Sequence, residues 1–348
     1  EVREDDLTVE HIRYMYAALV TYCDQQLGRV LDVFDKHDLW QDTMLVVNTD
    51  HGFLMGEHDW WAKVVTPFFQ EVAHIPFWIY DPRHSDCVGE TRDSVVQTID
   101  LAPTILDYFD IPATRDMQGK SLTGAMLNDE PVREAALYGV MGGQVNVTDG
   151  QYVYMRGNAT EDNSPLFEYT LMPTHMNSLF SVRELSSWEK FEDFSFTKAC
   201  PVMQIPSRTP RFLLAQDNPY GKGRTATLLF DVQADPGQTN PLTDAGLEIR
   251  MIKLMLHEMA RNECPPEQYV RLGLPEPFRA DAGDLDGVIE LPSEERIEAA
   301  CVLQTQRGRE IAEHGGNGLP KMPFGDISFP DNLRLRPGYV FSQTSDKG

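Results

Sequence analysis

Apolar residues recur at helical spacing in two long stretches of this chain. The first runs from Thr8, a suitable N-cap, to about Lys36. Its apolar positions are Ile12, Met15, Tyr16, Leu19, Val20, Cys23, Leu27, Val30, Leu31 and Phe34. The second runs from Ala245 to about Arg261 and carries a stripe of methionines. We predict an amphipathic helix at each place, the first laid on a sheet and the second with its methionines in a core.

Short apolar runs bounded by turn residues predict strands. Residues 44–49 are apolar and partly β-branched, which suits a strand covered on both faces, as in a mostly parallel sheet. Residues 77–80 form a second apolar run, and weaker patterns predict strands at 136–140 and 152–155. Mixed helices and strands of this kind indicate an α/β fold. The stretch 158–220 gives no clear pattern, and such a long irregular segment is often functional.

Two further helices have readable starts. The first spans 100–109, with Asp100 as its expected cap and Pro103 in the first turn, where a missing amide hydrogen costs nothing. The second spans 293–313, capped by Ser293 and followed by Gly315 and Gly316.

Candidate chemistry follows the first predicted strand, where Asp50, His51 and Gly52 stand in sequence. Ligands of parallel sheets gather at the carboxyl ends of strands, and a carboxylate beside an imidazole suits a divalent metal ion. Glycine lets the backbone turn close to the ion. A plain turn, with Asp50 capping the backbone, explains the same three residues and is the commoner outcome for this tripeptide.

The longer segment favours the metal site. Thr-Asp-His-Gly, then Gly-Glu-His, then Lys63 thirteen positions after Asp50, closely resembles the metal-binding segment of the sulfatase family, in the alkaline-phosphatase-like superfamily. The resemblance implies that Asp50 and His51 are metal ligands and that Lys63 contacts the transferred sulfate or phosphate group, in substrate binding and catalysis. His58, in the Gly-Glu-His triplet, is a candidate substrate-binding residue, with a buried packing role as the alternative.

His74 stands where many sulfatases have an arginine, before Ile75 and Pro76. A histidine that titrates near neutrality and faces an anion can protonate a leaving oxygen, so His74 is a candidate catalytic residue. A core histidine satisfied by a backbone carbonyl is the alternative interpretation.

Two more segments resemble the family in the expected order. One is Asp-Leu-Ala-Pro-Thr-Ile-Leu-Asp from Asp100, followed by Met-Gln-Gly-Lys-Ser-Leu to Leu122, and we expect it to serve packing. The other runs from Leu228 to Leu242, with Gln238 where the family usually has glutamate.

The resemblance covers roughly residues 8–262. It implies that residues 1–135 form the C-terminal part of the sulfatase catalytic α/β domain, an alkaline-phosphatase-like, mostly parallel sheet flanked by helices. Residues 136–265 would form a smaller α+β subdomain with an antiparallel sheet and a final helix, and 266–348 an extension of unknown role. The family's Cys/Ser-x-Pro/Ala-x-Arg motif does not occur in this sequence. We therefore expect the nucleophile, formylglycine in sulfatases, to lie in a missing upstream part of the same protein.

The expected activity is metal-dependent hydrolysis of a small-molecule or saccharide sulfate ester. Oxygen and imidazole donors suit calcium best, with manganese or magnesium as alternatives. Because an Asp-His pair also occurs in phosphonate monoester hydrolases of the superfamily, a phosphonate monoester or phosphodiester hydrolase is a second reading. A non-catalytic fragment or scaffold that lacks the nucleophile is a third.

Composition and charge limit the classes of binding partner that we expect. The 54 acidic and 30 basic residues give a net charge of −24, which argues against a nucleic-acid partner. No run of eighteen apolar residues occurs, so we expect no membrane span. Five scattered cysteines favour reduced thiols and hence a cytoplasmic location. A homo-oligomer is compatible with all of this.

Overall fold

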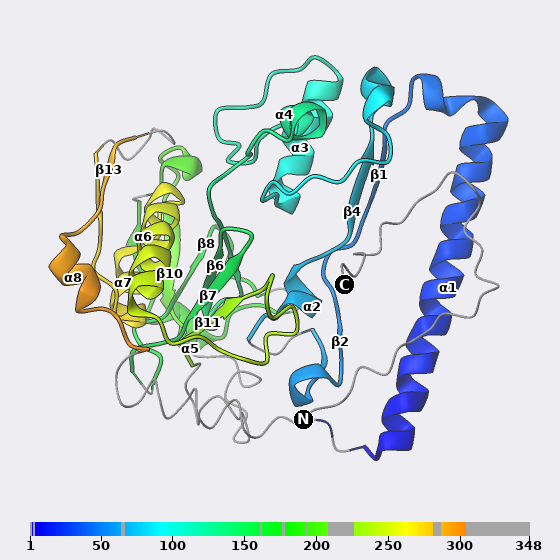
Figure 1. Cartoon of the computed structure of the whole chain (residues 1–348). Helices are drawn as coiled ribbons and strands as arrows, with labels where there is room; N and C mark the ends of the chain where they lie inside the picture. The colour runs from blue at the N-terminus through cyan, green and yellow to red at the C-terminus, as the bar shows by residue number, and fades with distance from the viewer. Residues whose placement is uncertain are drawn as a thin grey trace.

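The computed structural model describes residues 2, 4–63, 67–160, 162–175, 178–192, 194–207, 226–280 and 287–303, which form a mixed helix-and-sheet fold (Figure 1). The helices are α1 (Asp6–His37), α2 (Gln70–Ala73), α3 (Leu101–Tyr108), α4 (Thr123–Asn128), α5 (Val182–Leu185), α6 (Ala245–Arg261), α7 (Pro266–Leu272) and α8 (Glu294–Glu298). The strands are β1 (Leu45–Asn48), β2 (Leu54–Met55), β3 (Trp61–Ala62), β4 (Phe77–Tyr80), β5 (Ala136–Gly139), β6 (Val145–Thr148), β7 (Tyr152–Arg156), β8 (Phe167–Thr170), β9 (Glu189–Phe191), β10 (Val202–Pro206), β11 (Leu228–Asp231), β12 (Phe278–Arg279) and β13 (Ile289–Glu290). Short 3-10 turns are η1 (Leu39–Gln41), η2 (Glu57–Asp59), η3 (Pro82–Cys87), η4 (Thr98–Asp100) and η5 (Ser195–Thr197).

Helix α1 forms where the apolar period predicts it, but with a different cap. The side chain of Asp5 accepts the backbone N–H of Thr8 at 2.8 Å, so Thr8 lies inside the first turn and Asp5 is the N-cap. The helix makes its main contacts with η1 and β2, and only Val9 and Phe34 are buried on it. The expectation that α1 lies along a sheet is therefore wrong for the described residues, and Figure 1 shows the helix standing beside the rest of the fold.

Strands β1 and β4 form a two-stranded ladder at the residues predicted for them. They pair antiparallel, with Val46 opposite Ile79, and β1 is half-buried. Every strand pairing in the described ranges is antiparallel, which differs from the mostly parallel sheet expected for this domain. The physical reason is the connection: a parallel pair needs a long crossover, usually a helix along the sheet face. Between β1 and β4, the described residues form the β2–β3 hairpin with η2 and the four-residue α2. The mixed α/β class itself is confirmed.

The larger core lies between α6 and the antiparallel sheet β11-β7-β6-β5. Met251, Met255 and Met259 of α6 are buried there, which confirms that the methionine stripe is core. The sequence pattern missed β6, because Asn146 interrupts its apolar residues although its side chain is buried.

A buried carboxylate attaches the later residues to this core. Glu248 of α6 accepts the Tyr154 hydroxyl at 3.0 Å, the Val302 N–H at 3.0 Å and the Leu303 N–H at 3.1 Å. The predicted helix 293–313 is much shorter, since α8 ends at Glu298 and the next residues turn toward Glu248. Residues 304–313 lie outside the described ranges.

The stretch that gave no clear pattern contains a three-stranded antiparallel sheet, β8-β10-β9, and the short helix α5. Tyr169 packs edge to face on Phe191 and on Phe194, with ring centroids 4.8 and 5.1 Å apart, and Phe191 is tilted against Phe194 at 4.8 Å. Residues 208–225 of this stretch lie outside the described ranges.

The segment from Asp100 to Leu122 serves packing, as expected, but Asp100 does not cap α3 with its side chain. Its buried carboxylate instead accepts the Arg133 guanidinium, with Nη1 2.6 Å from Oδ2, and the backbone N–H groups of Gln97 at 2.8 Å and Lys120 at 2.9 Å. Asp100 therefore forms a buried ion pair with Arg133 and does not cap α3.

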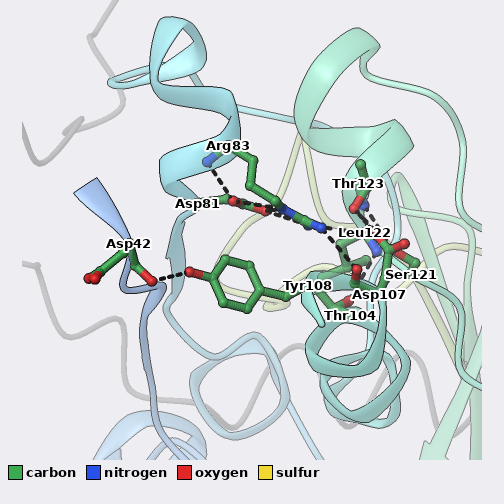
Figure 2. Close-up of polar contacts among 9 residues, drawn as sticks. All are labelled: Asp42, Asp81, Arg83, Thr104, Asp107, Tyr108, Ser121, Leu122 and Thr123. Atoms are coloured by element: carbon green, nitrogen blue, oxygen red, sulfur yellow. Dashed lines mark hydrogen bonds and ion pairs between the residues drawn. The ribbon is translucent and has the colours of Figure 1, made fainter. Parts of the chain in front are cut away.

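A second polar cluster joins α3 to η3 and the start of α4 (Figure 2). The Asp107 carboxylate accepts hydrogen bonds from the hydroxyls of Ser121, at 2.9 Å, and Thr123. The Arg83 guanidinium donates to the Asp81 carboxylate and, at 2.9 Å, to the backbone carbonyl of Asp107. This cluster holds the end of β4 against α3, and so fixes the β1–β4 ladder that carries the candidate site.

Candidate functional site

The candidate site begins where β1 ends. The Asp50 side chain is 79% exposed, and its Oδ2 atom lies 3.0 Å from Nε2 of His51. The other carboxylate oxygen accepts the backbone N–H of His51 at 3.1 Å. Both carboxylate oxygens of Asp50 therefore contact His51.

The ring of His51 is oriented by its own turn. Nδ1 lies 2.8 Å from the carbonyl oxygen of Gly52. Since a carbonyl oxygen only accepts, Nδ1 carries a proton in this contact, and Nε2 faces Asp50 and Lys63. Metal-binding histidines are commonly held by a bond of this kind.

A β-hairpin brings Lys63 next to His51. Strands β2 and β3 pair Leu54 with Ala62 and Met55 with Trp61, so the chain reverses and Lys63 follows directly after β3. The Lys63 ammonium contacts Nε2 of His51. The structure thus brings Asp50, His51 and Lys63 together.

Glycine suits position 52 because the backbone of α2 packs directly against this residue. Its N–H donates to the Val72 carbonyl at 2.9 Å, and the N–H of Phe53 donates to the Glu71 carbonyl at 3.0 Å. Helix α2 is held at its other end by Gln238, whose Oε1 accepts the N–H of Gln70 at 2.7 Å. The sequence marked Gln238 only as a departure from the family pattern, and gave no sign of this contact.

His74 ends α2 and is exposed. It lines an open cavity of ≈ 2710 Å³ together with Asp50, His51 and Lys63. The structure therefore places His74 on the same cavity as those three residues.

His58 is placed elsewhere. Its ring is buried and stacked on Phe69, with centroids 3.5 Å apart and planes 7° apart, and Nε2 lies 3.4 Å from Oε2 of Glu71. It does not line the cavity. The structure therefore places His58 away from Asp50, His51 and Lys63, which line the cavity. Sequence reasoning also missed Glu71, because nothing in the local spacing pairs it with His58.

The charges around Asp50 favour its ionised form. Partial desolvation acts to raise the pKa of this carboxyl, but the nearby His51 and Lys63 and the backbone N–H groups outweigh it, so the pKa is lowered from its ordinary value. Asp50 is therefore a carboxylate at neutral pH and offers a negative charge beside Nε2 of His51.

These two donors suit part of a divalent metal site. A carboxylate oxygen and an imidazole nitrogen 3.0 Å apart are donors that calcium, manganese or magnesium accepts. Calcium takes about six to eight ligands. Across the described ranges, no group of three or more histidine, cysteine or acidic side chains is placed to hold a metal ion. Asp50 and His51 thus fit as two ligands of a larger set.

Other expectations concern the whole chain. No helix within the described ranges is both long and apolar enough to cross a bilayer. All five cysteines carry free thiols.

Comparison with known proteins supports the resemblance. Residues 3–111 match the family model for sulfatase. An arylsulfatase of Clostridium perfringens is 32% identical over 109 residues, and an N-acetylglucosamine-6-O-sulfatase of Bacteroides thetaiotaomicron is 32% identical over 127 residues. A multifunctional alkaline phosphatase superfamily protein, PehA, of Trinickia caryophylli is 29% identical over 127 residues.

These alignments cover 31%, 35% and 36% of this chain and 22%, 22% and 24% of the relatives, so the chain matches about a quarter or less of their length. Among solved structures, BT4656 in complex with D-glucosamine-2-N,6-O-disulfate is similar with a TM-score of 0.46 and 16% identity, over 71% of this chain and 40% of that one. Over residues 3–111, this chain is thus similar to members of the sulfatase family.

Proposed function

We propose that this chain supplies the cation-binding and anion-binding side of the active site of a sulfuric ester hydrolase. The observation that carries the proposal is the convergence of Asp50, His51 and Lys63 at the end of β1. Two acceptors and one ammonium meet there on an open cavity, which is an arrangement suited to a metal ion and a sulfate group side by side.

Each residue has a role in this proposal. Asp50 and Nε2 of His51 hold the divalent ion, most suitably calcium, and when bound the ion acts as a Lewis acid on the ester oxygens. Lys63 binds the sulfate oxygens and neutralises the charge that grows on them during transfer. His74, on the same cavity, donates a proton to the leaving oxygen.

The attacking group is not assigned to this chain. The expected nucleophile is formylglycine on an upstream part of the same protein, which makes that part the required partner. Hydrolysis then needs both parts, and residues 1–348 alone give none above a Lys63→Ala control.

The substrate class follows from the relatives. One of them is an N-acetylglucosamine-6-O-sulfatase, and we assign a sulfated saccharide to this site as well.

A second candidate function is hydrolysis of phosphonate monoesters or phosphodiesters. The similarity to PehA favours it, as does the Asp50-His51 pair. Lysine and a divalent ion stabilise a phosphoryl group by the same electrostatics.

The test combines this chain with its upstream part and measures hydrolysis of p-nitrophenyl sulfate and p-nitrophenyl phenylphosphonate, with calcium and with EDTA. The proposal expects faster turnover of the sulfate, loss with EDTA, and loss in Lys63→Ala and Asp50→Asn. Faster turnover of the phosphonate establishes the second function instead. No turnover of either ester identifies the chain as a non-catalytic scaffold.

A further inference from the structure

His58 and Glu71 form a contact that the proposed chemistry does not use. They come from η2 and α2, and both atoms that face each other, Nε2 and Oε2, are buried. The His58 ring also stacks on the ring of Phe69, with ring centroids 3.5 Å apart. Withdrawing a carboxylate oxygen and an imidazole from water is costly. Within the described ranges neither facing atom has a hydrogen-bond partner, so their 3.4 Å contact is the polar contact that links η2 to α2.

The backbone around Glu71 touches the candidate site directly. The Glu71 carbonyl accepts the N–H of Phe53 at 3.0 Å, and the Val72 carbonyl accepts the N–H of Gly52 at 2.9 Å. A small rotation or shift of α2 therefore moves the Gly52 peptide.

The Gly52 peptide in turn orients His51. Its carbonyl oxygen is 2.8 Å from Nδ1 of His51, and that bond turns Nε2 toward Asp50. The buried contact thus connects to the ligand atom through two hydrogen-bonded steps.

We infer that His58 and Glu71 are a buried positioning pair that sets the orientation and tautomer of His51 through α2 and Gly52. The inference rests on the proposed function, in which His51 is a metal ligand, and extends it to residues that touch neither metal nor substrate. It assigns His58 to the support of the site, where the sequence suggested contact with substrate.

The pair is tested with His58→Phe, which keeps an aromatic ring against Phe69, and Glu71→Ala, which keeps the α2 backbone. Glu248→Ala is the matched control, because it removes a buried carboxylate from the other core. The chain is labelled with ¹⁵N-histidine, and the His51 signal among its nine histidines is assigned with His51→Gln. Long-range ¹H–¹⁵N spectra of the metal-free chain report which ring nitrogen carries the proton.

We expect the wild type and Glu248→Ala to show His51 as the single Nδ1–H tautomer, and His58→Phe and Glu71→Ala to show a mixture. The double variant should show no larger fraction of the second His51 tautomer than the more affected single variant, since both changes break the same His58–Glu71 contact. Calcium titrations should show a roughly 10-fold weaker affinity in both single variants, the low end for losing groups that orient a metal ligand.

An unchanged His51 signal in both single variants overturns the inference. A mixture in Glu248→Ala of the same size also overturns it, because the effect would then reflect general destabilisation. If the wild type binds no calcium, the metal role in the proposed function fails, while the His51 signal still decides the positioning pair.

Discussion

A β-carbon on Gly52 would lie 1.8 Å from the carbonyl oxygen of Glu71, well inside the contact distance of any two atoms. The turn that presents Asp50 and His51 is therefore built around a missing side chain. The obstacle is backbone, which cannot rotate away as a flexible side chain would.

Gly52→Ala should accordingly displace α2 or the turn and destabilise the chain by about 1–3 kcal/mol, the usual cost of forced overpacking. Urea unfolding measures the loss. Gly28→Ala is the control, because a β-carbon there meets nothing within 4 Å and α1 should gain stability from alanine. Equal stability of Gly52→Ala and the wild type would contradict the observed packing.

Calcium should raise the unfolding free energy of the wild-type chain if Asp50 and His51 bind it. At a concentration 100 times the dissociation constant the gain is about 2.7 kcal/mol, by mass action on the folded state. Asp50→Asn should lose the gain, since it removes the charged ligand. Lys63→Ala should keep it, because this change removes a competing cation from Nε2 of His51. Thermal unfolding with and without EDTA gives the comparison, and a gain that survives Asp50→Asn would place the ion elsewhere.

The buried Asp100–Arg133 pair should dominate the stability of the segment around α3. Asp100→Asn leaves the Arg133 guanidinium, 4% exposed, without its counter-charge, and breaking such a pair costs about 3–5 kcal/mol. Lys253→Ala removes an exposed pair with Glu294 and should cost less than about 1 kcal/mol. Chemical denaturation separates the two variants, and similar losses would contradict the assigned difference in burial.

Acid should progressively weaken the start of α5 as the pH falls from 4.5 toward 2. The Ser181 backbone N–H, then the Ser181 hydroxyl and His175, lower the pKa of Glu184 to about 2 from 4.5. Because the folded pKa is depressed, the carboxylate stabilises the fold fully above pH 4.5 and loses this effect as the pH falls toward 2. Carboxyl ¹³C NMR follows the titration. His175→Gln should raise the midpoint, and an unchanged midpoint would show that His175 does not contribute.

Local patterns were read correctly where the deciding interaction lies within a few residues. The apolar period gave α6 its full range, Ala245–Arg261, and the run at β4 gave Phe77–Tyr80. The cap of α1 was misplaced by three residues, because Asp5 and Thr8 both suit an N-cap and only the backbone geometry selects between them.

The site divides in the same way. The resemblance to the sulfatase family pointed to Asp50, His51 and Lys63, and the structure places these three residues together at the end of β1. The places of His58 and Glu71, of Asp100 and Arg133, and of Gln238 and Gln70 were decided only by the tertiary structure. Each of these pairs joins elements separated in the chain, and their partners are selected by which polar groups become buried together, a property that no local pattern contains.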